Sequence, residues 1–232
     1  MRQYIFEKSY PSLDYIVLRW PKCRHVIAKY ALSNYIKPDL LKVSKACLNS
    51  LNFYKKDPLL LVIKDLTKKC SKNFTSNKYH DQHHFKAVLV ISCLFAKLYK
   101  LKDKDKILLI IIALTHDMNH QGKRIISHQF YQEKKTTNEL RRMVYKKLLN
   151  RITWIRVEKI ILNTYFPVNP GVSDDIVEKI ILDSDIASST LFGFLNGLKL
   201  SKRLKNEIGF NEKSITLYKN FLNLIKSRKL YF

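Results

Sequence analysis

The sequence predicts an all-α protein, and three observations carry that prediction. The 232 residues include only five glycines and six prolines, so long uninterrupted elements are expected. Apolar residues in segments 104–116 and 174–190 recur at helical rather than alternating spacing. An apolar content of 46% is enough to bury a sizeable core in one or two domains.

The first 72 residues are expected to form several short helices. Prolines interrupt this region at four places, namely Pro11, Pro21, Pro38 and Pro58. We interpret 1–72 as an N-terminal helical cap that packs on the rest and belongs to the same domain, with 73–232 as the core. A polar loop at 73–77 follows the cap, and Ser76 or Asn77 is the expected N-cap of the next helix.

Apolar periodicity predicts the later elements. A helix at 79–99 repeats apolar residues at three- and four-residue steps, as at Val88, Ile91 and Leu94. A charged turn at 100–106 leads into a second helix at 105–120, which ends before a glycine. Further helices are expected at 137–149, 154–164, 174–190 and 215–227, with a loop at 166–171.

Five of the seven histidines fall into two short segments on these first two helices. On a helix His80 and His84 share one face, as do His116 and His120, because residues four apart lie one turn apart. A helical hairpin would bring the two segments to within about one or two turns of the same level. With Asp117 beside them, the spacing predicts a shared metal site. Imidazole and carboxylate suit zinc, manganese, iron or nickel, and a more oxygen-rich site accepts magnesium.

Position along the chain also indicates which of the remaining histidines and acidic residues could be metal ligands. His83 points about 100° away around the helix from its neighbour and is expected not to be a ligand. His25 and His128 are isolated and are expected to be ordinary surface or core residues. An acidic segment further along the chain can complete the site, but periodicity does not choose between Asp183 and Asp185.

The histidine motifs resemble those of the HD superfamily of metal-dependent phosphohydrolases, and most closely the class I 3′,5′-cyclic-nucleotide phosphodiesterases. The family's Tyr-His-Asn-x-x-His and His-Asp-x-x-His-Pro-Gly motifs correspond to Tyr79-His80-Asp81-Gln82-His83-His84 and His116-Asp117-Met118-Asn119-His120-Gln121-Gly122. Weaker matches follow in the same order at Thr137-Asn138-Glu139-Leu140, Ile160-Ile161-Leu162-Asn163-Thr164 and Ser184-Asp185-Ile186-Ala187-Ser188. The resemblance covers 79–189 and implies a compact helical bundle of the HD type.

By position, the resemblance implies a first metal ion held by His84, His116, Asp117 and Asp185. It favours Asp185 over the acid two residues before it. It also implies that Asp117 bridges to a second, mostly water-ligated ion. The expected cofactors are therefore two divalent ions, with zinc, manganese, magnesium or iron as candidates.

The resemblance also assigns catalytic roles. It implies that His80 is the general acid that protonates the leaving ribose oxygen. His120 would contact the bridging hydroxide or its surroundings. Tyr79 is a weak candidate for substrate binding.

Several family features are missing from this chain. Asp81 replaces an asparagine of the first motif, and Ile125 stands where an asparagine is expected. A Leu-Glu pair has no counterpart, since 146–150 occupies its place. The glutamine that clamps the purine ring in the family cannot be placed, because Gln129 and Gln132 come too early and no glutamine follows. The residues that match the family's metal ligands are therefore present in this chain, whereas the residue that recognises the purine base is not.

Net charge, cysteine content and the length of apolar runs indicate where the protein resides and what kinds of partner it has. The net charge of +24 attracts phosphate groups, but lysine outnumbers arginine and the charge is spread along the chain, so a nucleic-acid partner is not favoured. Four dispersed cysteines without a C-x-x-C pair indicate reduced thiols. The longest apolar run, 107–114, is too short to span a membrane, and no signal-peptide pattern is evident. A cytoplasmic location is expected, with no membrane partner and no prediction of oligomeric state.

The leading hypothesis is a phosphoester hydrolase that converts a 3′,5′-cyclic nucleotide to the 5′-monophosphate. Attack by a metal-bound hydroxide, with His80 as general acid, is the mechanism that the resemblance implies. An HD-type nucleotidase or (deoxy)nucleoside-triphosphate hydrolase is the second hypothesis. The third is a non-catalytic nucleotide-binding regulatory protein.

Overall fold

The structure, a computed structural model, describes residues 12–31, 38–53, 57–73, 77–123, 128–148, 152–165, 173–190 and 193–228. Over these ranges the chain forms helices and no strand, which confirms the all-α prediction. The helices are α1 (Leu13–Leu18), α2 (Arg24–Ala31), α3 (Leu40–Ser50), α4 (Leu59–Asn73), α5 (Gln82–Leu98), α6 (Asp103–Thr115), α7 (Tyr131–Leu148), α8 (Trp154–Asn163), α9 (Ile176–Thr190), α10 (Phe194–Ile208) and α11 (Ser214–Arg228). None of the described helices is long and apolar enough to cross a membrane.

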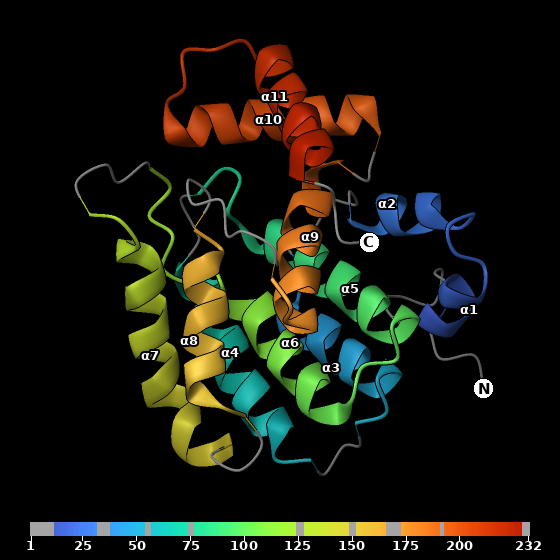
Figure 1. Cartoon of the computed structure of the whole chain (residues 1–232), viewed down its shortest axis with the longest axis vertical. Coiled ribbons are helices and arrows are strands. Elements are labelled where there is room, and N and C mark those ends of the chain that lie inside the picture. Colours follow the sequence, from blue (N-terminus) through green and yellow to red (C-terminus); the bar gives the residue numbers. More distant parts are fainter. Residues whose placement is uncertain are drawn as a thin grey trace.

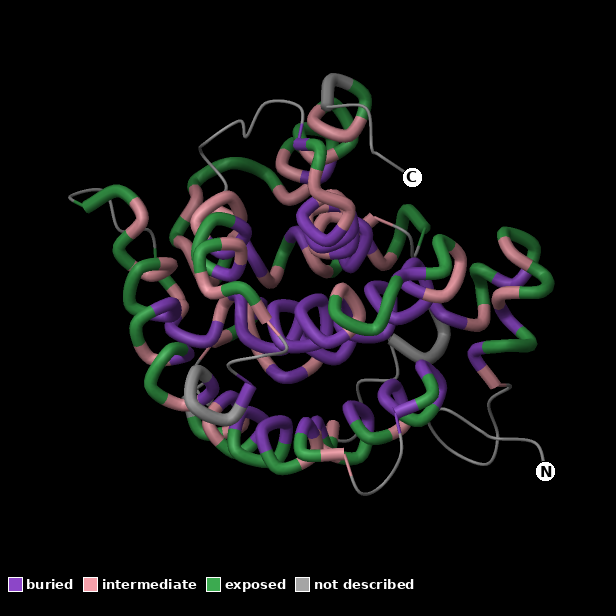
Figure 2. The backbone as a smooth tube through the Cα atoms, turned by 60° about the horizontal axis from the view of Figure 1, so that its bottom comes forward, coloured by how far each residue is buried: buried purple, intermediate pink, exposed green. Residues whose placement is uncertain are grey.

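The centre of the molecule is the hairpin of α5 and α6, joined by a four-residue turn (Figure 1). Almost every residue of α5 is buried, and α6 is buried from Ile107 to Thr115. A helix that is apolar on all sides must be surrounded by other elements. Accordingly α3 and α9 pack on α5, while α4 and α9 pack on α6. Figure 2 shows the buried stretches gathered in the middle of the molecule.

The N-terminal helices share this central core. α1, α2 and α3 contact α5, and α4 contacts α6 and α7. Buried side chains such as Leu13, Ile27 and Leu48 belong to the same apolar cluster as the residues of α5. The helices before α5 therefore cover one side of the core, and the division at residue 72 stays a prediction.

Helices α10 and α11 form a pair that stands on α9 (Figure 1). They pack closely because residue 197 is a glycine: a Cβ there would lie 2.0 Å from Cε2 of Tyr218 on α11. α10 ends at Gly209, whose φ of +78° is the left-handed conformation that favours glycine at a helix end. The sequence analysis predicted α11 but not α10.

Two helix boundaries near the histidines differ from the predicted ones. α5 begins at Gln82 rather than 79, because the Asp81 carboxylate caps it by accepting from backbone N–H groups in the first turn. The expected N-cap at Asn77 was wrong, and Ser76 lies outside the described residues. α6 ends at Thr115 rather than 120, and 116–119 forms a turn. His80 therefore precedes α5 while His83 and His84 lie in its first turn, and His116 and His120 follow the end of α6.

Other boundaries agree more closely. α8, α9 and α11 begin and end within two residues of their predicted limits. α7 starts at Tyr131, six residues before its predicted start. The predicted loop at 166–171 lies outside the described residues.

Candidate metal centre

The four side chains predicted as metal ligands lie together. His84, His116, Asp117 and Asp185 each offer an atom that lies within 4.8 Å of the others. His116 Nε2 is 3.0 Å from Asp117 Oδ2, and His84 Nε2 is 3.3 Å from both Asp117 Oδ2 and Asp185 Oδ1. The first turn of α5, the turn after α6 and the middle of α9 thus supply what we call the ligand quartet.

The quartet has the properties of a cation site. The His84 and His116 side chains are almost fully buried, yet their Nε2 atoms have no hydrogen-bond partner in the described part of the chain. Such unpartnered buried atoms are costly unless something else satisfies them. Behind the quartet, Ser188 Oγ lies 3.4 Å from His84 Nδ1 and orients that ring. Two imidazoles and two carboxylates around one point fit a divalent cation.

The charges of the quartet reinforce one another. Burial lowers the pKa of His116, but the adjacent Asp117 and then Asp185 outweigh it, so the pKa is raised well above its usual value. Burial acts in the opposite direction on Asp117, whose pKa nevertheless falls well below its usual value because His116 and His80 lie beside it. The carboxylates therefore stay ionised at neutral pH, as cation binding requires.

A second group lies against the first and consists of His80, His120 and Glu207. The two imidazole rings are stacked, with centroids 3.6 Å apart and planes at 26°. The Glu207 side chain is only 2% exposed and accepts from the backbone N–H of Tyr79 and of His80, the latter at 3.0 Å. It also bonds His80 Nδ1. The other ring nitrogen, His80 Nε2, is 3.9 Å from Asp117 Oδ2 and so faces the quartet.

The environments of the two stacked histidines drive their pKa values apart. For His80 burial is opposed by Asp117 and Glu207, which together raise its pKa. For His120 burial and the neighbouring His80 charge lower the pKa to about 4. Burial alone would raise the pKa of Glu207, but its bonds to His80 bring it down to about 2. At neutral pH His120 is therefore neutral and Glu207 is ionised, while the pKa of His80 is shifted in the direction that favours the protonated ring.

Sequence reasoning missed Glu207. It lies on α10, which was not predicted, and 127 residues separate it from His80. No local motif marks it. A general chemical expectation could have suggested such a residue, because a buried histidine is commonly oriented by a carboxylate that bonds one ring nitrogen.

Asp81 and Arg203 tie the segment before α5 to α10. The Asp81 carboxylate accepts from the backbone N–H of His83 at 2.9 Å and of His84 at 3.2 Å, which caps α5. Its other oxygen bonds Arg203, one turn before Glu207 on α10. Where the resembling family has asparagine, this chain uses a carboxylate for both tasks.

Asn77 joins the two histidine segments. Its side-chain amide donates to the backbone carbonyls of His80, at 3.3 Å, and of His120, at 3.1 Å. Gly122 makes this approach possible: its φ is +66°, and a Cβ there would lie 2.4 Å from Asn77 Oδ1. The Gly122 N–H also donates to His120 Nδ1 at 3.1 Å, so neutral His120 carries its proton on Nε2.

Asn119 anchors the turn after α6 to α7. Its side-chain amide lies 3.3 Å from Thr136 Oγ1 and 3.1 Å from Glu139 Oε2. Glu139 is also paired with Lys69 of α4. Glu139 belongs to the weak family match at 137–140, and its observed task is to hold the turn that presents Asp117.

The remaining predicted residues lie outside the two groups. Tyr79 is buried, its hydroxyl bonds Ser189 and its ring packs 5.1 Å from that of His84, so it supports the site from within. Of the two acids that periodicity left open, Asp185 joins the quartet while Asp183 is buried elsewhere on α9. Among the described residues His83 takes part in neither group. His25 and His128 are exposed, and Ile125 lies outside the described residues.

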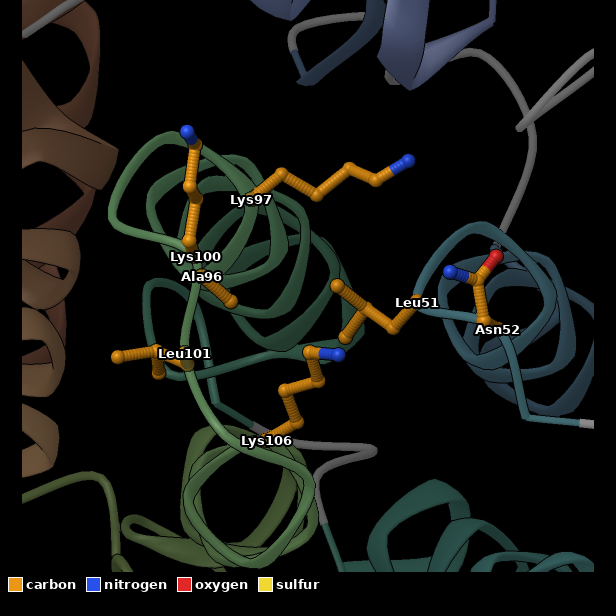
Figure 3. A pocket seen from close by; sticks show the side chains of 7 residues that line it. All are labelled: Leu51, Asn52, Ala96, Lys97, Lys100, Leu101 and Lys106. Atoms are coloured by element: carbon orange, nitrogen blue, oxygen red, sulfur yellow. The ribbon is translucent and has the colours of Figure 1, made fainter.

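A separate cavity of about 200 Å³ lies at the other end of α5 (Figure 3). Its lining includes Lys97, Lys100 and Lys106, together with Leu51 and Asn52. The cavity is about 20 Å along α5 from the quartet, at 1.5 Å per residue. Lys97 and Lys100 lie at the C-terminal end of α5, where positive charge balances the helix dipole, whereas Lys106 lies in the first turn of α6 and pairs with Asp103. It contributes nothing to the candidate centre.

Comparisons of the chain with protein-family models, with curated proteins and with solved structures found no match. The helical fold and the His/Asp cluster are compatible with an HD-type domain.

Proposed function

We propose that this protein is a metal-dependent phosphoester hydrolase of the HD type. The observation that carries the proposal is the pairing of two unlike groups: a buried quartet suited to a cation, and beside it an imidazole held by a carboxylate. A divalent ion in the quartet would polarise a phosphoryl oxygen and lower the pKa of a water molecule. The protein's own residues supply the rest.

His80 is the proposed general acid. Glu207 bonds its Nδ1, which leaves Nε2 directed at the quartet, 3.9 Å from Asp117 Oδ2. Asp117 and Glu207 raise the pKa of His80 and so favour the protonated ring, which is the form that can give a proton to the leaving oxygen. The Glu207 carboxylate that bonds the ring is itself fixed, because it accepts from the backbone N–H groups of Tyr79 and His80, so little reorientation of the ring is needed.

His120 complements His80. Its pKa of about 4 keeps it neutral, so the two stacked rings do not repel each other. With its proton on Nε2, neutral His120 can donate a hydrogen bond but cannot easily deliver a second proton. Two titratable groups with opposite shifts are the usual sign of divided acid and base roles.

The proposed substrate is a small phosphate ester, and a 3′,5′-cyclic nucleotide converted to the 5′-monophosphate is the leading candidate. The test is to load purified protein with Mn²⁺ or Mg²⁺ and to assay cyclic AMP, cyclic GMP and a panel of nucleotides. Turnover of a cyclic nucleotide supports the leading candidate. If no phosphoester is hydrolysed while bound metal is confirmed, the enzyme proposal is wrong.

One observation favours a second candidate, a nucleotidase or (deoxy)nucleoside-triphosphate hydrolase. The two early glutamines have other surroundings: the Gln132 side-chain oxygen accepts from the Gln121 N–H at 2.9 Å, and Gln129 is exposed. Hydrolysis of a (deoxy)nucleotide without hydrolysis of cyclic nucleotides would identify this second activity.

A non-catalytic, nucleotide-binding role is separated from both by His80→Ala. If the protein is an enzyme, this change abolishes turnover while the metal content stays the same, because His80 is not in the quartet. His83→Ala is the matched control, since it removes a neighbouring imidazole that lies outside both groups. Equal loss of activity in the two variants would contradict the role given to His80.

A further inference from the structure

We propose that Arg203 of α10 is a positioning residue for His80, and that it acts by anchoring α10 to Asp81. This inference rests on the proposed function and deepens it, because His80 is the general acid assigned there. Arg203 itself belongs neither to the ligand quartet nor to the group of His80, His120 and Glu207.

His80 lies outside any helix, so contacts from other parts of the chain set its position. α5 begins only at Gln82, and residues 77–81 form a bend before it. Within a helix, backbone N–H groups are bonded by the helix's own carbonyls. Here the N–H groups of Tyr79 and His80 are bonded by the Glu207 carboxylate instead. The placement of His80 therefore depends on the placement of α10.

Polar contacts from two residues tie α10 to this segment. The helix packs on α9 and α11 (Figure 1), while Arg203 and Glu207 bond the residues just before α5. The two residues are four apart and lie on one face of α10, one turn from each other. A single tie would let α10 rotate or slide along the segment. Two ties on the same face fix both movements.

The Asp81 carboxylate is a fixed anchor for Arg203. Its Oδ1 accepts from the backbone N–H of His83 at 2.9 Å and of His84 at 3.2 Å, which holds the carboxylate against the first turn of α5. Its Oδ2 accepts from Arg203 Nη2. The Asp81 and Arg203 side chains are only 17% and 26% exposed, so this ion pair is better shielded from water than a surface pair.

The two ties place the proposed acid relative to the ligand quartet. Arg203 is anchored to the turn of α5 that carries His84, and Glu207, one turn further along α10, bonds His80. Because a misplacement of about 1 Å can lower a rate about 100-fold, loss of one of the two ties should lower kcat by about tenfold.

The experiment compares Arg203→Gln with Asp81→Asn. Asparagine caps a helix about as well as aspartate, so Asp81→Asn keeps the start of α5 and removes only the ion pair. Both variants should increase the amide hydrogen exchange of Tyr79 and His80 by about tenfold and leave exchange in α6 unchanged. In Mn²⁺-loaded protein, with the phosphoester identified by the nucleotide panel, both should lower kcat and leave KM and metal content unchanged.

Two further variants are the controls. Lys202→Gln removes a positive charge from the neighbouring, exposed position of α10 and should leave exchange and kcat unchanged. Arg203→Lys should restore most of the exchange protection and of kcat, because one nitrogen, Nη2, makes the contact to Asp81. The double variant Asp81→Asn/Arg203→Gln should behave like either single variant, since each removes the same pair.

The outcomes separate positioning from other effects. Opposite changes of kcat in Arg203→Gln and Asp81→Asn would overturn the inference, because long-range electrostatics predicts opposite effects for the loss of opposite charges. Unchanged exchange at Tyr79 and His80, additive effects in the double variant or an equal effect of Lys202→Gln would also overturn it. Should Arg203→Gln not fold by circular dichroism, Asp81→Asn and Arg203→Lys decide. Faster exchange at these two amides in a protein that hydrolyses no phosphoester would instead reject the proposed function and leave the positioning of His80 standing.

Discussion

Replacing Glu207 by glutamine tests how the second group is held together. The change keeps the shape of the side chain but removes the charge that faces His80. The pKa of Glu207 is about 2 in the folded protein, against an ordinary value of 4.5. At about 1.4 kcal/mol per pH unit, this difference corresponds to about 3 kcal/mol of folding free energy.

The direction of the Glu207 pKa shift determines the pH range in which the two proteins should differ in stability. A carboxyl group whose pKa is lowered by folding stabilises the protein above its ordinary pKa, and this contribution is lost as the pH falls through the folded value. Urea unfolding of wild type and Glu207→Gln should therefore differ by about 3 kcal/mol near pH 6 and converge as the pH falls from 4.5 toward 2. Because the two proteins share all other carboxylates, the contribution of those groups cancels in the difference between the two unfolding free energies at each pH.

The control is Glu212→Gln, which removes an exposed carboxylate just after α10. Exposed substitutions of this kind change stability by less than about 0.5 kcal/mol. A gap between wild type and Glu207→Gln that stays constant from pH 6 to pH 2 would refute the reasoning, because it would mean that the charge of Glu207 contributes nothing.

Three further outcomes are expected. Gly122→Ala should cost about 1–3 kcal/mol in urea unfolding, because of its φ of +66° and the 2.4 Å approach to Asn77 Oδ1; a neutral effect would contradict the described turn. Mn²⁺ at about 100 times its Kd should stabilise wild type by about 2.7 kcal/mol in thermal unfolding and His84→Ala much less, whereas equal stabilisation would place the ion elsewhere. Gly197→Ala, whose Cβ would meet Tyr218 at 2.0 Å, should increase amide hydrogen exchange in α10, and unchanged exchange would argue against close packing of α10 on α11.

The sequence predicted the elements that have strong local signals. Apolar periodicity located α5, α6, α8 and α9, since these helices lie in the core and repeat apolar residues on their buried sides. Spacing along the hairpin brought His84 close to His116, as observed. The resemblance chose Asp185, which periodicity alone did not distinguish from its neighbour.

The start of α5, helix α10 and Glu207 could not be predicted, because they depend on contacts between residues far apart in the sequence. α5 starts at 82 because Asp81 caps it better than the polar residues before, and that preference is strengthened by Arg203, which lies 122 residues away. α10 was missed because glycines lie before, within and after it, and Gly197 looks like a break until Tyr218 is seen against it. Glu207 was not predicted as a site residue because it lies on that helix.

The attachment of α10 to the segment before α5 separates two tasks along the chain. In the proposed function, cation binding belongs to α5, the turn after α6 and α9, whereas proton delivery by His80 depends on Glu207 of α10. Under that proposal, a substitution on α10 would change proton delivery without touching a residue of the ligand quartet. If the proposed function holds, loss of Glu207 alone would leave the four residues of the ligand quartet in place while removing the carboxylate that bonds His80. Under the same proposal, a single substitution would then separate a hydrolase from a protein that only binds the cation.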